Sequence, residues 1–430
     1  MRYTNLGVFM RISRILAAAA AALALAACSP SSVGEDPSQD PTQPEGSASN
    51  SASPHPTTTA TPSTLSILSG GDILLHLSVN EAARVGDTLD YTTLFSAIQP
   101  WIDGADLSLC ALEVPIVPPG EEPSNYPNFG APPEIASSLK AMGWDGCALA
   151  TNHSMDRGFA GVVSTADTLD AAGLGHHGTA RTAEEAEQIQ YYTLESGGRE
   201  VKVAHLSAST LTNGIPLRQE EPWSWNVVGE LGLRSVDDLI ADAQRARDEG
   251  ADLVVVSMHW GTEYVSEPIE EQTTIADKLA ASGAVDLVFG NHSHVPEPVT
   301  RLEGGPDGQG MWVAWSMGNM ISGQTIENHG YRVVTGLMTT ATVEVPAEGP
   351  AHVTNLEWTA VAQDDRTDHL FILNDLLQGA QGAEFPGLSL SPGEIQSRAD
   401  ATYPVMTADG STERTVAPTP QSTLVGIEKK

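Results

Sequence analysis

Polar residues able to bind a metal ion follow several apolar, strand-like segments of the sequence. Five of the chain's twelve histidines stand shortly after such segments, and Asp, Glu and Asn residues occupy equivalent places. In open α/β sheets, ligands bind beyond the carboxyl ends of the strands, so we expect these side chains to meet at one edge. The candidate metal ligands are Asp72, Glu113, Asn152, His259, His292 and His294.

This set of side chains contains oxygen and imidazole donors but no thiolate. Such a set suits Zn, Mn or Fe better than Ca or a structural zinc site, so the sequence predicts one or two divalent metal ions. Single residues have simpler explanations, because Asp72 and Asn152 could cap the next helix and Glu113 could pair with an arginine. His292 and His294, however, have the spacing that places two side chains on one side of an extended segment.

Other polar residues close to these segments are candidates for contact with a substrate or metal: His76, Arg157 and Glu263. Arginine is rare in this acidic chain, so Arg157 could receive an anionic group, although a surface ion pair explains it equally well. His176 and His177 follow a Gly-Leu-Gly sequence and are expected in a solvated turn.

Apolar runs alternate with Ala-rich, helix-like stretches from Leu65 onward, which predicts an α/β fold with a largely parallel or mixed sheet. The expected strands are Leu65–Ser69, Leu107–Leu112, Gly146–Ala150, Val201–Leu206, Leu253–Met258, Val285–Gly290 and Trp312–Met317. The expected helices are Pro133–Met142, Gly161–Ala172, Val236–Glu249 and Glu270–Ser282. The Val/Thr alternation over 330–361 indicates a β-hairpin that closes the sheet.

The first 27 residues have the pattern of a secretory signal, because three arginines precede a short run of Ala and Leu. The run ends at Leu25-Ala26-Ala27-Cys28, which resembles a bacterial lipobox. Cys28 is therefore the expected lipid attachment site, which would place the protein on the extracytoplasmic face of the cell membrane. An ordinary secretory signal with an incidental cysteine is the alternative.

The remaining chain divides by composition into three parts. Residues 28–64 are rich in Ser, Pro and Thr and are expected to form a disordered tether. Residues 65–365 are expected to form the folded domain. Residues 366–430 are expected to be a partly disordered extension with one helix over His369–Leu377 and a frayed end over the last twenty residues.

Charge and cysteine content exclude several classes of protein. The formal net charge is −34, so binding to phosphate backbones of nucleic acids is excluded. Three cysteines are too few for a disulfide scaffold. Cys110 and Cys147 lie in two expected strands, and we expect buried, free thiols there rather than a disulfide, because interior cysteines are commonly small apolar residues.

The sequence blocks that carry the candidate ligands resemble the CapA, or poly-γ-glutamate capsule-synthesis, family over roughly residues 67–322. This family is similar to the calcineurin-like metallophosphoesterases, which implies a four-layer α/β/β/α sandwich around a two-metal site. The blocks are Gly71-Asp72, Leu112-Glu113, Thr151-Asn152-His153-Ser154-Met155-Asp156-Arg157-Gly158, Met258-His259-Trp260-Gly261-Thr262-Glu263-Tyr264, Gly290-Asn291-His292-Ser293-His294-Val295 and Ser316-Met317-Gly318-Asn319.

The resemblance implies a role for each candidate residue. Asp72 and His294 would bind one metal, while the other would be bound by Asn152, His259 and His292. Glu113 would bridge the two ions. His153 would act as general acid, and Asp156, three residues later, could accept its ring proton and orient it.

The sequence departs from the metallophosphoesterase pattern at two places. Leu74 stands where a histidine usually follows the first Asp by two residues, and Leu112-Glu113 replaces the usual bridging Asp motif. The resemblance implies work on a capsule or envelope polymer, by a metal-dependent hydrolase or transferase site. The alternatives are a non-catalytic accessory that passes polymer to membrane synthesis enzymes, and a general phosphoesterase.

Overall fold

The computed structural model describes residues 59–379 and 385–430. Cys28, the signal sequence and most of the expected tether lie outside these residues. Across the two described ranges, every helix is too short or too polar to cross a lipid bilayer.

The first β-sheet has eight strands, of which β1, β4, β5 and β6 run parallel. The predicted hairpin is confirmed as β14 and β15, which pair antiparallel next to β1. In sheet order the strands are β16 (Leu370–Ile372), β15 (His352–Gln363), β14 (Thr335–Val345), β1 (Ser63–Leu74), β4 (Leu107–Leu112), β5 (Gly146–Ala148) and β6 (Gly175–His177), with β13 (Asn319–Ser322) beside β1.

The second sheet has seven strands, and its centre is the parallel run of β8, β9, β10 and β12. These strands are Val-rich, as expected for strands buried on both faces. In order they are β11 (Val299–Leu302), β12 (Met311–Ala314), β10 (Leu287–Asn291), β9 (Leu253–His259), β8 (Arg199–Ser209), β7 (Gln190–Ser196) and β17 (Thr423–Lys429).

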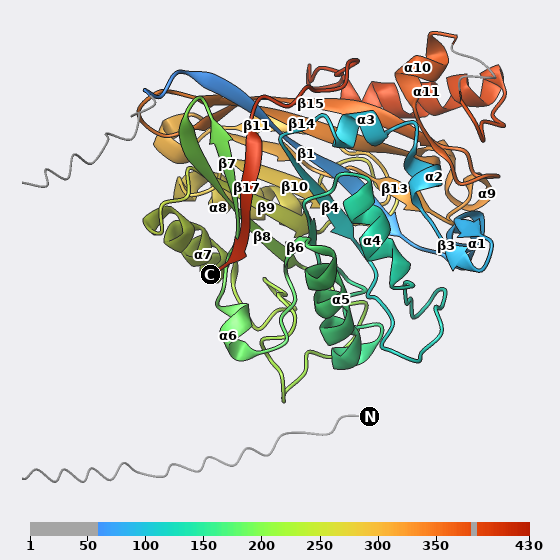
Figure 1. Cartoon of the computed structure of the whole chain (residues 1–430), viewed down its shortest axis with the longest axis horizontal. Helices are drawn as coiled ribbons and strands as arrows, with labels where there is room; N and C mark the ends of the chain where they lie inside the picture. Colours follow the sequence, from blue (N-terminus) through green and yellow to red (C-terminus); the bar gives the residue numbers. More distant parts are fainter. Residues whose placement is uncertain (1–58, 380–384) are drawn as a thin grey trace, which may run out of the picture. The chain divides into compact units, whose positions relative to one another are not determined.

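The two sheets pack face to face and helices cover their outer faces, which gives four layers (Figure 1). Five helices pack on the first sheet: α1 (Leu77–Ala82), α2 (Thr92–Phe95), α3 (Gln99–Ile102), α4 (Glu134–Ala141) and α5 (Gly158–Ala172). Two pack on the second: α7 (Val236–Asp248) and α8 (Glu270–Ser282). The other elements are β2 (Arg84–Val85), β3 (Thr88–Leu89), α6 (Ala183–Ala186), α9 (Ile326–His329), α10 (Leu373–Leu377) and α11 (Pro392–Met406).

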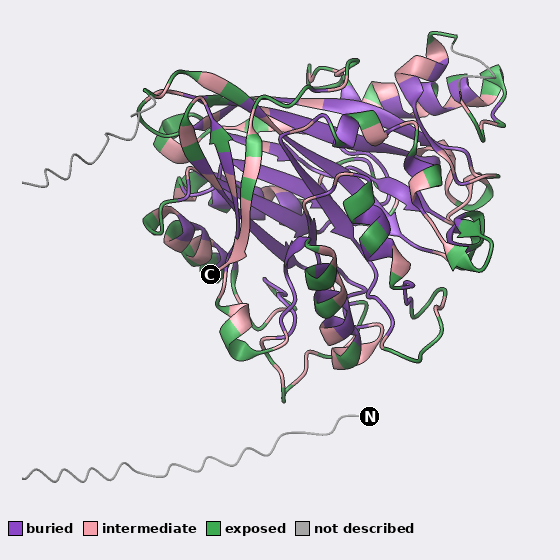
Figure 2. Ribbon diagram, in the orientation of Figure 1, coloured by how far each residue is buried: buried purple, intermediate pink, exposed green. Residues whose placement is uncertain are grey.

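Successive side chains along each strand point to opposite faces of the sheet, and this explains how the layers pack. Leu107 and Leu109 of β4 face the second sheet, where they join Val255 of β9 in one buried cluster. Cys110 and Leu112 point the other way, toward the helices. Figure 2 shows this distribution, with buried strands inside and exposed outer faces on the helices. Each fully buried Leu or Val side chain contributes about 1.5–3 kcal/mol to the stability of the fold. The three apolar clusters between the four layers therefore fix the relative positions of the strand ends.

The expectation of a frayed C-terminus is wrong. β17 pairs antiparallel with β7 over Thr423–Lys429, and α11 buries Ile395 and Ala399 against the layer between the sheets. The expected helix over His369–Leu377 is in part wrong, because β16 occupies its first half and only Leu373–Leu377 is helical. The first strand starts at Ser63, slightly earlier than predicted.

Two expectations for particular residues are also wrong. Cys110 and Cys147 form a disulfide, because parallel pairing of β4 and β5 sets them side by side with Cα atoms 4.4 Å apart. His176 and His177 lie in the buried strand β6 rather than in a solvated turn. His205, inside β8, is also buried.

Candidate metal centre

The candidate ligands come from the carboxyl ends of strands in both sheets. Asp72 lies near the end of β1, and Glu113 directly follows β4. His259 is the last residue of β9. His292 and His294 follow β10, which pairs in parallel with β9. Because the sheets are stacked, these strand ends face one another across the sandwich, and all five side chains are buried.

Backbone features at the strand ends explain how the chain comes this close. The β1 pairing contains an irregularity at Asp72, and a Cβ atom on Gly71 would lie 2.2 Å from the carbonyl oxygen of Gly318. Only glycine therefore allows the two segments to approach. His292 and His294 have φ angles of 100° and 58°, which are rare for residues other than glycine and typical of functional sites.

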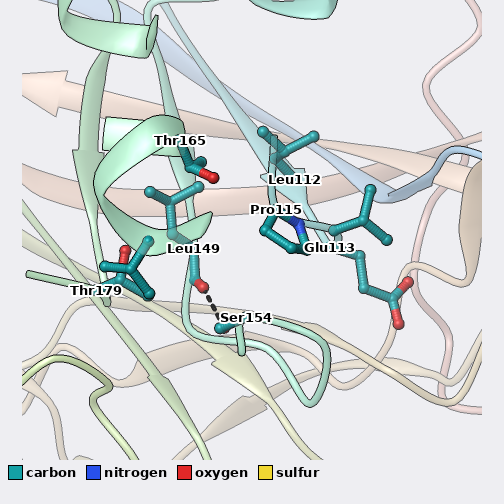
Figure 3. Close-up of a pocket in the computed structure, with 9 residues that line it drawn as sticks. Leu112, Glu113, Pro115, Leu149, Ser154, Thr165 and Thr179 are labelled. Atoms are coloured by element: carbon teal, nitrogen blue, oxygen red, sulfur yellow. Dashed lines mark hydrogen bonds between the residues drawn. The ribbon is translucent and has the colours of Figure 1, made fainter. Parts of the chain in front are cut away.

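Two groups of side chains could each hold one metal ion. Glu113, His259 and His292 form the first, while Asp72, Glu113 and His294 form the second, with ligand atoms within 4.8 Å of one another in each group. Glu113 belongs to both groups, and its Oε1 lies 3.7 Å from His259 Nε2 and 3.8 Å from His294 Nε2. The carboxylate turns away from the small cavity lined by Leu149 and Thr165 (Figure 3).

The chemistry of these residues fits bound divalent cations. Asp72 Oδ1, both carboxylate oxygens of Glu113 and Nδ1 of His292 are buried without a hydrogen-bond partner among the described residues. Uncompensated buried carboxylates cost several kcal/mol each, and cations are the partners that remove this cost. Imidazole and carboxylate donors together favour Zn, Mn or Fe.

Burial also sets the protonation of the cluster. It raises the pKa of Asp72 to about 8, although the hydrogen bond from the backbone N–H of His292 acts in the opposite direction and lowers it. Burial also raises the pKa of Glu113 well above its usual range. Burial lowers the pKa of His292 to about 3 and those of His259 and His294 well below the usual value. The imidazoles are therefore neutral, which is the form that binds metal ions.

Two asparagines hold the ligands in place. The amide nitrogen of Asn319 donates to Gln324 and to the backbone carbonyl of Val333, so its oxygen is left to accept from Nδ1 of His294 at 2.9 Å. This leaves Nε2 of His294 to face Glu113, as a ligand requires. Asn319 lies in one of the sequence blocks that resemble the CapA family, but no pattern in the sequence indicated that it would hold His294 in place.

Asn152 directs its amide oxygen toward the cluster. Its Oδ1 lies 2.9 Å from Nε2 of His259, and its Nδ2 donates to Oδ1 of Asn213 at 3.0 Å. Asn213 lies in a turn, with a φ angle of 49°. Its contact with Asn152 joins positions 61 residues apart, so no local pattern could indicate it.

His153 follows Asn152 and is also buried. Its Nδ1 lies 2.7 Å from Oδ2 of Asp156, which also accepts from the backbone N–H of Phe129. The ring packs edge-on against Phe129, with centroids 4.9 Å apart. The structure thus brings together the two residues predicted to act as acid and orienting carboxylate.

The three remaining candidates lie around the site with different contacts. His76 packs against Phe129 and accepts from the backbone N–H of Gly323 through Nδ1. Arg157 is engaged with the loop over 121–129, including an ion pair with Glu121 at 3.4 Å. Glu263 is exposed, but its charge raises the pKa of Glu113, after the larger effects of burial and of the Asp72 charge.

Stacked sheets between helices, with a histidine–carboxylate cluster at the strand ends, define a mixed α/β protein of metallophosphoesterase-like fold. The sequence profile described as "Bacterial capsule synthesis protein PGA_cap" matches residues 66–324, and the chain belongs to this family. The family expectation from the sequence blocks is confirmed.

Three curated relatives have names that refer to polyglutamine, capsule or PGA synthesis. A probable polyglutamine synthesis accessory protein of Mycobacterium tuberculosis is 26% identical over 280 residues, which cover 57% of this chain and 72% of that protein. The capsule biosynthesis protein CapA of Bacillus anthracis is 27% identical over 59% of each chain. The PGA biosynthesis protein CapA of Bacillus subtilis is 27% identical over 44% of this chain and 46% of its own.

Proposed function

We propose that this protein is a lipid-anchored, extracytoplasmic member of the CapA-type capsule biosynthesis family. Its metal centre would act as a hydrolase or transferase on a linkage of a capsule or envelope polymer of poly-γ-glutamate type. The observation that carries this proposal is the set of buried Asp72 and Glu113 oxygens without hydrogen-bond partners, surrounded by neutral histidines and adjacent to His153.

The residues would divide the chemistry between them. Asp72, Glu113, Asn152, His259, His292 and His294 would hold two divalent cations. Bound cations of this kind lower the pKa of a bound water and stabilise negative charge on reacting oxygens. His153 would deliver a proton to the leaving group, and Asp156 would fix its ring by accepting from Nδ1.

Location outside the cytoplasm is supported by two independent features. The lipobox-like segment at Cys28 is one of them. The other is the Cys110–Cys147 disulfide, because disulfides persist in oxidising compartments and are rare in the cytosol. Membrane synthesis proteins would be the partners that produce or export the polymer.

The test is metal content and polymer cleavage measured on the same purified protein. We expect about two metal ions per chain by elemental analysis and a metal-dependent change in the length of poly-γ-glutamate chains. Glu113→Gln should lower both, because it removes the negative charge shared by the two groups. Glu303→Gln, at an exposed position, is the matched control.

Two results would contradict the proposal. A protein without bound metal would exclude the metal centre. A metal-loaded protein that cleaves simple phosphoesters but leaves the polymer unchanged would indicate the general phosphoesterase instead.

The accessory function is the second candidate. Leu74 stands where the metallophosphoesterase pattern has a histidine, and the nearby His76 uses Nδ1 to accept from Gly323. A polymer-binding protein without catalysis would bind metal and polymer but leave the length of the chains unchanged.

A further inference from the structure

Residues 210–235 connect β8 to α7 by a long loop, and one turn of this loop reaches the candidate metal centre. Loops of this length are uncommon in compact domains and are usually functional. The turn consists of Asn213 and Gly214, which both have positive φ angles, of 49° and 72°. The backbone N–H of Ile215 donates to the carbonyl oxygen of Thr212 at 2.8 Å and closes the turn.

Asn213 is exposed, yet its side chain contacts two buried residues of the site. Its Oδ1 accepts from Nδ2 of Asn152 at 3.0 Å. Its Nδ2 lies 3.3 Å from Nε2 and 3.4 Å from Nδ1 of His153, so the amide lies against the imidazole ring. A single side chain of a surface turn therefore covers both the candidate ligand and the candidate acid.

The covered ring nitrogen is the one from which His153 would transfer a proton. Nδ1 of His153 lies 2.7 Å from Oδ2 of Asp156, and because a carboxylate accepts hydrogen bonds, Nδ1 carries a proton. Nε2 is therefore the nitrogen that must come within hydrogen-bonding reach of a leaving group. The amide of Asn213 fills part of the space beside Nε2, and His153 is only 6% exposed. A polymer linkage cannot reach Nε2 until a neighbour of the ring moves.

Asn213 is the neighbour that is free to move. Of the described side chains that contact the His153 ring, Phe129 and the carboxylate of Asp156 are buried, whereas Asn213 lies at an exposed turn. The adjoining loop residues Ile215 and Leu217 are only partly buried where they pack against the cluster around α5. Segments with few buried apolar contacts open at the lowest free-energy cost in a folded protein.

We propose that residues 212–215 form a gate of the site, and that Asn213 leaves His153 when a substrate enters. In the closed gate the amide of Asn213 holds Asn152 and covers Nε2 of His153. In the open gate both residues face the incoming linkage, so the gate decides which molecules reach the acid. This inference rests on the role proposed above for His153.

The test is the rate at which diethyl pyrocarbonate modifies His153 in the purified full chain, measured by mass spectrometry of its peptides. Asn213→Ala should raise this rate about tenfold, because it removes both polar contacts that hold the gate closed. Gly214→Ala should also raise it, since alanine disfavours a positive φ, although the added Cβ would meet no described atom within 4 Å.

Hydrogen exchange at the backbone N–H of Ile215 separates an opening gate from a simple loss of cover. This N–H is protected by its bond to Thr212 in the closed turn, so its exchange should become faster in Asn213→Ala. Gln219→Ala, at an exposed position of the same loop, is one matched control. Gly410→Ala is the other, because Gly410 has a φ of 74° and equal space for a Cβ. Both controls should match the wild type.

Equal modification of His153 in the wild type, Asn213→Ala and Gly214→Ala would overturn the gate. So would faster modification in Asn213→Ala with unchanged exchange at Ile215, because Asn213 would then be a fixed cover. Neither measurement uses metal or substrate. A gate that opens as expected in a protein that cleaves no polymer would therefore contradict the proposed function and leave the gate standing.

Discussion

At the scale of single residues, His153 and His292 lie in one site but have different surroundings. His153 has a carboxylate partner, Asp156, at 2.7 Å, and an aromatic neighbour, Phe129. His292 is buried with no partner for Nδ1 among the described residues, and its ring lies 5.0 Å from that of His259. A ring held by a carboxylate beside the site is suited to proton transfer, while the unpartnered Nδ1 of the neutral His292 ring offers a lone pair that could bind a metal ion.

These surroundings predict different effects of two alanine variants. His292→Ala should lower the metal content, whereas His153→Ala should keep it and lower the rate on any identified substrate by about 10²–10⁴-fold. Metal stoichiometry and turnover must be measured on the same preparations. Loss of metal in His153→Ala would make that residue a ligand, and full activity would exclude it as the acid.

The sequence indicates the candidate ligands better than the residues that hold them in place. Histidines and carboxylates directly after apolar strands are visible in the sequence, because strand ends of one sheet share an edge. Asn213 and Asn319 act through hydrogen bonds to residues 61 and 25 positions away, to Asn152 and His294. Such contacts are made by tertiary packing, so neither composition nor spacing indicates them.

At the scale of elements, the disulfide joins β4 and β5, the strands that precede Glu113 and Asn152. Cys110 and Cys147 are directly opposite each other in the parallel pairing. The bond therefore ties together the two strand ends that supply part of the candidate metal centre, and it closes a long segment of chain.

Removal of this bond should destabilise the protein. For cysteines 37 residues apart, the loss of chain entropy in the unfolded state corresponds to about 3–4 kcal/mol. We expect Cys110→Ala/Cys147→Ala to lower the free energy of unfolding in urea by about this amount, and reduction of the wild type to have a similar effect. Cys28→Ala is the control. Two free thiols at positions 110 and 147 in the denatured, unreduced protein would contradict the disulfide.

Long apolar elements could be predicted from the sequence, whereas short or partly exposed elements could not. The strands β4 and β9 are long and apolar, and the sequence predicted them almost to the residue. β6 contains only Gly175, His176 and His177, and β17 is a partly exposed edge strand, so both lack a strong pattern. Each depends on pairing with a neighbouring strand rather than on local preference.

At the scale of the whole molecule, the net charge of −34 conflicts with an anionic polymer as substrate. Long-range repulsion would slow the approach of such a polymer, and the effect would be screened by salt. Bound divalent cations at the metal centre would reverse the sign of the field locally. Attachment to a membrane near the polymer-producing proteins would also raise the local concentration of polymer and so reduce the need for long-range attraction.

Membrane attachment is the last prediction, and it depends on Cys28. One acyl chain gives only marginal membrane binding, whereas several chains on one cysteine hold a protein stably, because each buried methylene contributes about 0.8 kcal/mol. Cys28→Ser should therefore move the protein from the membrane fraction to the soluble fraction, or leave it as an unprocessed precursor. The Cys110→Ala/Cys147→Ala variant is the control and should stay with the membrane. Normal processing of Cys28→Ser with unchanged membrane retention would exclude Cys28 as the anchor.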